Sequence, residues 1–121
     1  MDESYEPKCQ EILKQKKIRF AGVIDENGKI LAGGFKKNII PLEEDKKKLD
    51  SFMEFVSMVS IRKEYDHSLG PINYLAARRD KLVLVSFPFP ITKVILLISA
   101  EPTVNIEEIA GVVVSTFSGY N

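Results

Sequence analysis

The most constraining feature of this sequence is a pair of apolar runs joined by Asn27-Gly28. The first run, Ile18–Asp25, is apolar almost throughout, which is typical of a strand covered on both faces. The second run, Lys29–Phe35, contains Gly33-Gly34, which weakens a strand and indicates an edge, a bulge or a close backbone approach. Asn-Gly is the strongest short hairpin signal, because a type I′ turn needs positive φ at both central residues. The sequence therefore predicts an antiparallel hairpin.

Helices are predicted on both sides of this hairpin. Residues 2–17 carry apolar side chains every three or four positions, which is the period of an amphipathic helix. Asp45–Asp66 is predicted to be the longest helix, with acidic residues at its positive end. The last helix is predicted to begin after Asn105, whose side chain would cap it with Glu108 at the third helical position. The β-prone run 112–114 leaves a closing strand as the alternative there.

Three more strands are predicted after Gly70-Pro71, at Ile72–Arg78, Lys81–Phe87 and Ile91–Ser99. The last of these is nearly all apolar, so we expect it at the centre of the sheet. The predicted order is helix, strand, strand, helix, strand, strand, strand, helix. Tight links make most strand pairs antiparallel, and five strands with helices on both faces give a three-layer α/β/α domain of the α+β type. We expect a single domain over residues 1–121, because this length is typical of one domain.

Composition excludes several classes of function. Lys plus Arg equals Asp plus Glu at 17 each, so the net charge is +0 and no general attraction to nucleic acid or an anionic membrane is expected. One Cys and one His exclude a disulfide framework and a multi-Cys zinc site, and no cofactor or metal is predicted. The acidic N-terminus lacks the features of a signal peptide, and no apolar run is long enough to span a bilayer. These features predict a cytoplasmic protein.

Catalytic chemistry is poorly supported by the residues. Cys9 lies on the apolar face of the first predicted helix. We therefore interpret it as a small core residue and not as a nucleophile. His67 beside Asp66 is interpreted as a solvated loop pair. An enzyme would need Cys9 and His67 close together, and the predicted elements place them apart. We therefore predict that the protein is not an enzyme.

The long predicted helix carries two apolar stripes. At 100° per residue, one stripe faces a common direction and is assigned to the sheet: Leu49, Phe52, Met53, Val56 and Val59. Met58, Ile61 and Tyr65 fall on the opposite side, with Glu54 extending the line, and Phe55 lies on the boundary. A surface helix of a monomer should be polar there, so the second stripe indicates another packing partner. The alternative is that scattered exposed apolar residues are normal.

The segment 20–34, FAGVIDENGKILAGG, resembles the opening hairpin of the roadblock/dynein light-chain superfamily. In that family an apolar strand ends in Asp, a Gly turn follows, and the next strand carries small residues. The long helix, the three later strands and the last helix match the rest of the family's order, which is a roadblock/profilin-like architecture. Longin-like and PAS-like domains share much of it.

The resemblance implies a non-enzymatic scaffold or regulator that forms homodimers or pairs with a related roadblock-like chain. It also implies partners such as Ras-like small GTPases. Such dimers use the long helix and the neighbouring strand, which in this sequence is Ile72–Arg78. The candidate interface residues are therefore Glu54, Met58, Ile61, Tyr65, Ile72 and Tyr74. The alternative is a PAS-like small-molecule sensing domain, in which Gly33-Gly34, Phe35 and the Phe87–Phe89 segment would border an apolar pocket.

Overall fold

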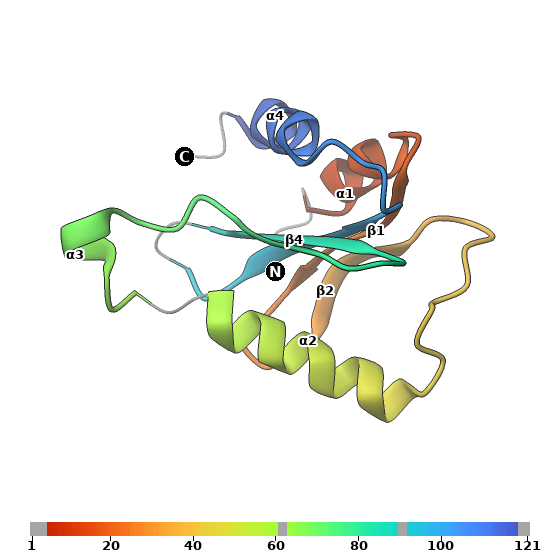
Figure 1. Ribbon diagram of the computed structural model, residues 1–121, viewed down its shortest axis with the longest axis horizontal. Helices are drawn as coiled ribbons and strands as arrows, with labels where there is room; N and C mark the ends of the chain where they lie inside the picture. Colours follow the sequence, from red (N-terminus) through yellow and green to blue (C-terminus); the bar gives the residue numbers. More distant parts are fainter. Residues whose placement is uncertain (1–4, 61–62, 90–91, 119–121) are drawn as a thin grey trace.

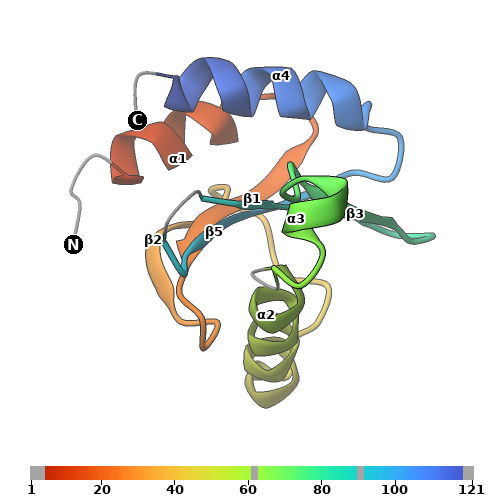
Figure 2. The ribbon, with the colours of Figure 1, turned by 90° about the vertical axis from the view of Figure 1, so that its left-hand side faces the viewer.

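The computed structural model describes residues 5–60, 63–89 and 92–118, and within them five strands form one sheet between two layers of helices (Figure 1). Helices α1 and α4 cover one face of the sheet, and α2 lies on the other (Figures 1 and 2). The elements are α1 (Tyr5–Leu13), β1 (Ile18–Ile24), β2 (Ile30–Phe35), α2 (Lys46–Ser60), α3 (Asp66–Leu69), β3 (Leu75–Arg78), β4 (Val83–Pro88), β5 (Ile95–Ala100) and α4 (Ile106–Phe117). The predicted three-layer architecture and order are confirmed, with the one-turn helix α3 as an addition.

The strands lie in the order β2-β1-β5-β4-β3, and every neighbouring pair is antiparallel. Strand β5 occupies the centre, and all six of its residues are buried, as the apolar run predicted. Pro88 ends β4 opposite Ile95, where the loss of one backbone donor does not interrupt the middle of the ladder. The two edges of the sheet are β2 and β3.

Two apolar cores flank the sheet because its side chains alternate between the faces. The larger core joins β1, β4 and β5 to α1 and α4, with Cys9 and Ile12 fully buried within it. The smaller core lies under α2 and contains Phe20, Ile24, Met53, Ile95 and Leu97. Leu49 and Val56 of α2 pack against this smaller core, which confirms the predicted sheet-facing stripe at these positions.

Several predicted boundaries are wrong by a few residues. The helix predicted over residues 2–17 is described from Tyr5 and ends at Leu13. Two tight turns follow, in which the Lys14 and Gln15 N–H groups donate to the Glu11 and Ile12 carbonyls, because the chain must reverse before β1. The three later strands begin three, two and four residues after their predicted starts.

The longest helix is shorter than predicted. Described helix α2 ends at Ser60, residues 61–62 lie outside the described part, and a separate turn of helix, α3, begins at Asp66. Asp45 precedes α2, and its Oδ1 accepts hydrogen bonds from the Lys47 N–H (2.9 Å) and the Lys48 N–H (3.3 Å). Asp45 is therefore the N-cap, as the predicted acidic start of this helix suggested.

The hairpin is confirmed, but its turn is of another type. Asn27 does not have positive φ, whereas Gly28 has φ of 81°. The Gly28 N–H donates to the Asp25 carbonyl (3.0 Å), and the Asp25 N–H donates to the Lys29 carbonyl (3.0 Å). This is a three-residue loop with glycine in the left-handed position, a common alternative to the two-residue type I′ turn.

The C-terminal helix begins as predicted. Asn105 Oδ1 accepts a hydrogen bond from the Glu108 N–H at 3.1 Å, and both Val104 and Ile109 are buried in the larger core. The run 112–114 lies within α4, so the alternative of a closing strand is wrong. Packing of the apolar face against the sheet outweighs the β propensity of this run.

Candidate dimerisation surface

Strand β3 is an open edge of the sheet. All four of its residues are exposed, and β4 is its neighbour on one side only. The Arg79 N–H donates to the Leu82 carbonyl (2.8 Å), so Arg79 and Leu82 form a hydrogen-bonded pair that continues the β3–β4 register. Because such pairs alternate in an antiparallel ladder, Leu75 and Ala77 bond to β4. Ala76 and Arg78 therefore direct their backbone N–H and C=O groups outward.

The opposite edge, β2, is obstructed. Gly33 and Gly34 have φ of 80° and 154°, which distorts the edge. The Gly33 N–H already donates to Glu6 Oε1 of α1 at 2.9 Å. This bond and one from Gln10 lower the pKa of the Glu6 carboxyl, so the anion that holds the Gly33 N–H is favoured. In the described part of the chain, the β3 edge of the sheet is thus open for pairing, whereas the Gly33 N–H on the β2 edge is already hydrogen-bonded.

Helix α2 is fixed to the β1–β2 hairpin turn. Ser57 is fully buried, and its hydroxyl donates to the Asp25 carbonyl. Gly28 lies so close to α2 that a Cβ there would be 2.4 Å from the Glu54 backbone nitrogen. Sequence reasoning missed Ser57, although it stands one helical turn after Met53 on the same face. The turn and the helix are therefore in direct contact.

This attachment defines the flanks of α2. With Met53 and Ser57 facing the sheet, helical geometry places Glu54 and Met58 on the flank next to the hairpin turn. Phe52 falls on the opposite flank, towards β4 and β3. Phe55 points away from the sheet and is 59% exposed, and Met58 is 56% exposed. Figure 2 shows β3 projecting beyond α2 on the side away from the hairpin.

The remaining sequence-predicted interface residues are dispersed. Tyr65 is 67% exposed just before α3, and Ile72 is half-buried. Tyr74 packs on the α4 face, where its ring centroid lies 5.6 Å from that of Phe87. Its hydroxyl donates to Glu107, and this bond raises the pKa of Tyr74.

Ile61 lies outside the described residues. Glu54 and Met58 therefore share one flank of α2, whereas Tyr65 and Ile72 stand near the start of β3. The sequence analysis assigned the dimer surface to the whole predicted strand Ile72–Arg78, and within that strand it did not single out Leu75 and Ala76, which stand on the free edge. The weak signal for them was their position in a short strand beside Gly70-Pro71.

The residues named for a sensing pocket do not meet. Phe35 lies on the α2 face, with its ring centroid 4.9 Å from that of Phe20. Phe87 and Phe89 pack on the α4 face, and Phe89 contacts Phe117 at 5.4 Å between centroids. A cavity of about 400 Å³ does lie under α2, lined by Phe35 and by residues not anticipated, among them Leu42, Leu49, Phe52, Leu84 and Leu97.

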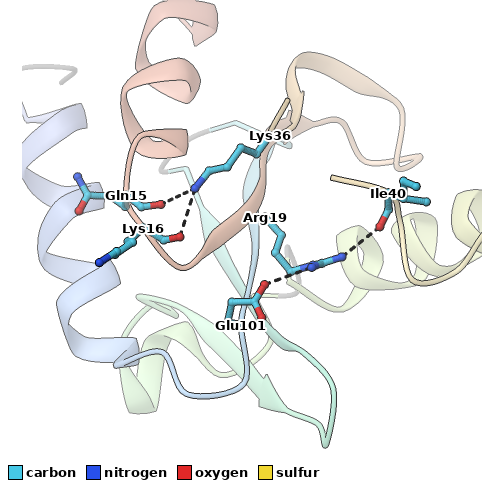
Figure 3. A network of polar contacts seen from close by, with 6 residues as sticks. All are labelled: Gln15, Lys16, Arg19, Lys36, Ile40 and Glu101. Atoms are coloured by element: carbon cyan, nitrogen blue, oxygen red, sulfur yellow. Dashed lines mark hydrogen bonds and ion pairs between the residues drawn. The ribbon is translucent and has the colours of Figure 1, made fainter. Parts of the chain in front are cut away.

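Polar contacts hold the connection between β2 and α2 against the sheet (Figure 3). Arg19 bridges Glu101 (3.2 Å) and the Ile40 carbonyl (3.1 Å), and Lys36 donates to the Gln15 carbonyl at 2.8 Å. Ile40 and Leu42 nevertheless keep most of their side-chain surface exposed. The connection therefore carries apolar side chains at the surface on an anchored backbone.

No catalytic pair is assembled in the described residues. Cys9 is fully buried in α1, and burial, together with the negative charge of Glu6, raises the pKa of its thiol to about 11. His67 is in α3, which Figure 1 shows well apart from α1. The described residues contain no cluster of three or more His, Cys, Asp or Glu suited to a metal ion. None of the described helices is long and apolar enough to cross a membrane.

Solved structures share this architecture. A roadblock/LC7 domain from Streptomyces avermitilis has a TM-score of 0.65 and 10% identity, covering 95% of each chain. MglB in a tetrameric arrangement has a TM-score of 0.72 and 14% identity, covering 98% of this chain and 88% of that one. Myxococcus xanthus MglB has a TM-score of 0.64 and 12% identity, covering 100% and 95%. The protein therefore has the roadblock fold that the hairpin resemblance predicted.

Comparison by sequence finds fewer matches than comparison by structure. No curated protein matches the chain. The model of the family of unknown function DUF6659 matches residues 2–119, so the chain belongs to that family.

Proposed function

We propose that this member of DUF6659 is a non-enzymatic scaffold or regulatory module that acts as a homodimer joined through β3 and α2. The proposal rests on the open β3 edge together with the exposed apolar side chains Phe55 and Met58 of α2. Unpaired strand edges and exposed apolar surface both favour association with another chain.

A second copy is the occupant that this surface fits best. A two-fold axis brings the same strand to itself in antiparallel order, so one self-complementary surface is enough. If the alternation continues one residue before β3, the backbone groups of Tyr74 also point outward, and Ala76 stands midway between Tyr74 and Arg78. A register centred on Ala76 would therefore use the whole edge, with Ala76 exchanging two backbone hydrogen bonds with its own copy. The sheet would become continuous across both copies.

Helix α2 would supply the apolar part of the interface. In the two-fold arrangement both α2 helices lie on the same side of the joined sheet. Phe52 stands on the flank of α2 that faces β4 and β3, and Phe55 stands on the outer face of the helix. The interface predicted from the sequence remains Glu54, Met58, Ile61, Tyr65, Ile72 and Tyr74. A pair of variants separates the outer face of α2 from the flank that carries Met58.

The fold supports a proposal for the class of partner. Roadblock-like proteins are scaffolds and regulators, and MglB and MglC are among the solved structures that share this fold. We propose a Ras-like small GTPase as the partner of the dimer, in the cytoplasm, with a related roadblock-like chain as the alternative to self-association. The buried Cys9, whose thiol has a raised pKa, supports a role without covalent catalysis.

Light scattering over a concentration series tests the proposal. We expect a mass near twice 13.7 kDa for the wild type. Phe55→Asp and Met58→Asp form a matched pair, because both side chains are exposed and neither change should unfold the chain. Loss of the dimer in Phe55→Asp alone assigns the outer face of α2 to the interface, and loss in Met58→Asp alone assigns the predicted stripe. A monomer at every concentration contradicts the proposal.

Partner binding is tested separately. A panel of purified Ras-like GTPases, loaded with GDP or a GTP analogue, is titrated into the wild-type dimer. We expect one nucleotide state to bind more tightly, because the switch segments of such GTPases are ordered by the γ-phosphate. Equal or no binding across the panel removes the GTPase from the proposal and leaves the dimer.

Small-molecule sensing is the second candidate function, and the cavity of about 400 Å³ under α2 favours it. This volume is in the range of ligand sites, and the lining is mainly apolar. A panel of apolar ligands should raise the melting temperature if the cavity is used. Substitution of Leu84 by Trp would fill the cavity and should abolish such a shift.

A further inference from the structure

The cavity of about 400 Å³ under α2 contains a buried hydroxyl in its apolar lining. Ser99 of β5 stands opposite Phe20 of β1 and Leu84 of β4, so its side chain lies on the α2 face of the sheet. The residue is only 6% exposed. In the described part of the chain its hydroxyl makes no hydrogen bond, and its oxygen is accessible from the cavity that it lines. This hydroxyl is therefore free to bond to a molecule in the cavity.

A β-bulge brings a guanidinium to the same cavity. The register between β1 and β5 shifts after Ile18, so Arg19 is the extra residue of the bulge, a feature that redirects a side chain. The Arg19 guanidinium donates to Glu101 (3.2 Å) and to the Ile40 carbonyl (3.1 Å), as Figure 3 shows. The side chain lines the cavity and is 15% exposed. Its two hydrogen bonds use two of five N–H donors, so donors remain for an oxygen atom of a bound molecule.

Positive charge is in excess in the cavity lining. The charge of Arg19 is balanced by Glu101. The other charged lining residues, among those that the structure describes, are Lys48, Arg79 and Glu43. Neither Lys48 nor Arg79 takes part in an ion pair within the described residues, and Glu43 accepts a hydrogen bond from the backbone N–H of the α2 N-cap at 3.1 Å. One positive charge is therefore left over, and a single carboxylate would balance it.

We propose that this cavity binds a small amphipathic carboxylate, with its apolar chain between α2 and the sheet and its carboxylate at Ser99 and Arg19. The inference rests on the small-molecule sensing proposed as the second candidate function, and it does not require the dimer. A purely apolar molecule would leave the Ser99 hydroxyl and the remaining Arg19 donors desolvated and unpaired, which is unfavourable. A cation would add to the excess positive charge. A carboxylate supplies both the acceptor oxygens and the balancing charge.

Three probes with the same apolar chain test the inference. Octanoate, octan-1-ol and octylammonium differ in the charge of the head group, and their dissociation constants for the wild-type protein are measured by isothermal titration calorimetry. We expect octanoate to bind about tenfold more tightly than octan-1-ol, because hydrogen bonds to a charged acceptor are stronger than those between neutral groups. Octylammonium should bind most weakly of the three, because its charge has the same sign as the excess charge of the lining.

Variants separate the hydroxyl from the charge. Ser99→Ala removes a hydroxyl without a partner in the described chain, so it should fold, and it should weaken octanoate binding about tenfold. The double variant Lys48→Gln and Arg79→Gln should weaken octanoate binding about fivefold and leave octan-1-ol binding unchanged. Lys47→Gln with Lys81→Gln is the matched control, because it removes the same charge from two exposed residues that do not line this cavity.

The outcomes separate this inference from the proposed dimer. Octanoate that binds no more tightly than octan-1-ol, or equally to the charge variant and its control, contradicts the inference. No binding at millimolar octanoate also contradicts it, and a weakened dimer in Leu84→Trp would then assign the cavity to the second copy. A dimer that fails to bind octanoate contradicts only this inference, whereas a monomer that binds octanoate contradicts only the dimer.

Discussion

Substituting proline at Ala76 separates assembly from folding. The N–H of Ala76 points away from β4, so its loss removes no hydrogen bond of the monomer's sheet. Proline is tolerated on an edge strand at such a position. In the dimer the same N–H would donate to the second copy. We therefore expect Ala76→Pro to fold and to dimerise poorly.

The magnitude follows from the proposed register. With Ala76 on the two-fold axis, its N–H and C=O groups form the two central hydrogen bonds between the copies, and proline removes both donors. Each bond contributes about 0.5–1.5 kcal/mol net, so the dimer should lose about 1–3 kcal/mol. This corresponds to a dissociation constant roughly 5- to 150-fold higher.

Sedimentation velocity across a dilution series measures this change, and circular dichroism with thermal melting checks the fold. Ala77→Pro is the control, because the Ala77 N–H bonds to β4 and its loss should lower the melting temperature. A folded Ala76→Pro variant with the dissociation constant of the wild type would refute the assignment of β3 as the pairing edge.

Three further predictions concern the monomer. Gly28→Ala should lower the free energy of unfolding by about 2–4 kcal/mol in denaturant titration, because φ is 81° and the Cβ would meet the Glu54 backbone. Asn105→Ala should cost about 1 kcal/mol in the same assay, since the Glu108 N–H loses its cap. Cys9 should resist thiol reagents at pH 8 until the chain unfolds. Its folded pKa of about 11 exceeds the ordinary thiol value of 9.0, so the free energy of unfolding should fall by up to about 2–3 kcal/mol as the pH rises from 9 to 11.

The fold was predictable because its signals are local and consistent. The apolar run of β5, the hairpin around Gly28 and the cap at Asn105 each follow from a short stretch of sequence. The boundaries were less predictable. Helix α1 ends at Leu13 because the chain must reverse into β1, a tertiary requirement that the helical period of residues 2–17 does not contain.

The candidate surface was predictable only in outline. The sequence indicated that α2 has exposed apolar residues, and Phe55 and Met58 are both exposed. It did not indicate which flank of α2 adjoins the open sheet, because that depends on the contact of Ser57 with Asp25 across 32 positions of sequence. The outward direction of the Ala76 N–H likewise depends on the phase of the β3–β4 ladder.

The asymmetry between the edges of the sheet bears on the type of assembly. If β2 and β3 were equally open, copies could add β3 to β2 head to tail, and such contacts continue into filaments unless they close into a ring. In this chain Glu6 holds the Gly33 N–H and two positive-φ glycines distort β2, so that contact is disfavoured. Pairing of β3 with itself consumes the one open edge of each copy. In such a dimer both β3 edges are paired and only the obstructed β2 edges remain. A third copy therefore has no open edge to join, which favours a discrete dimer over a growing sheet.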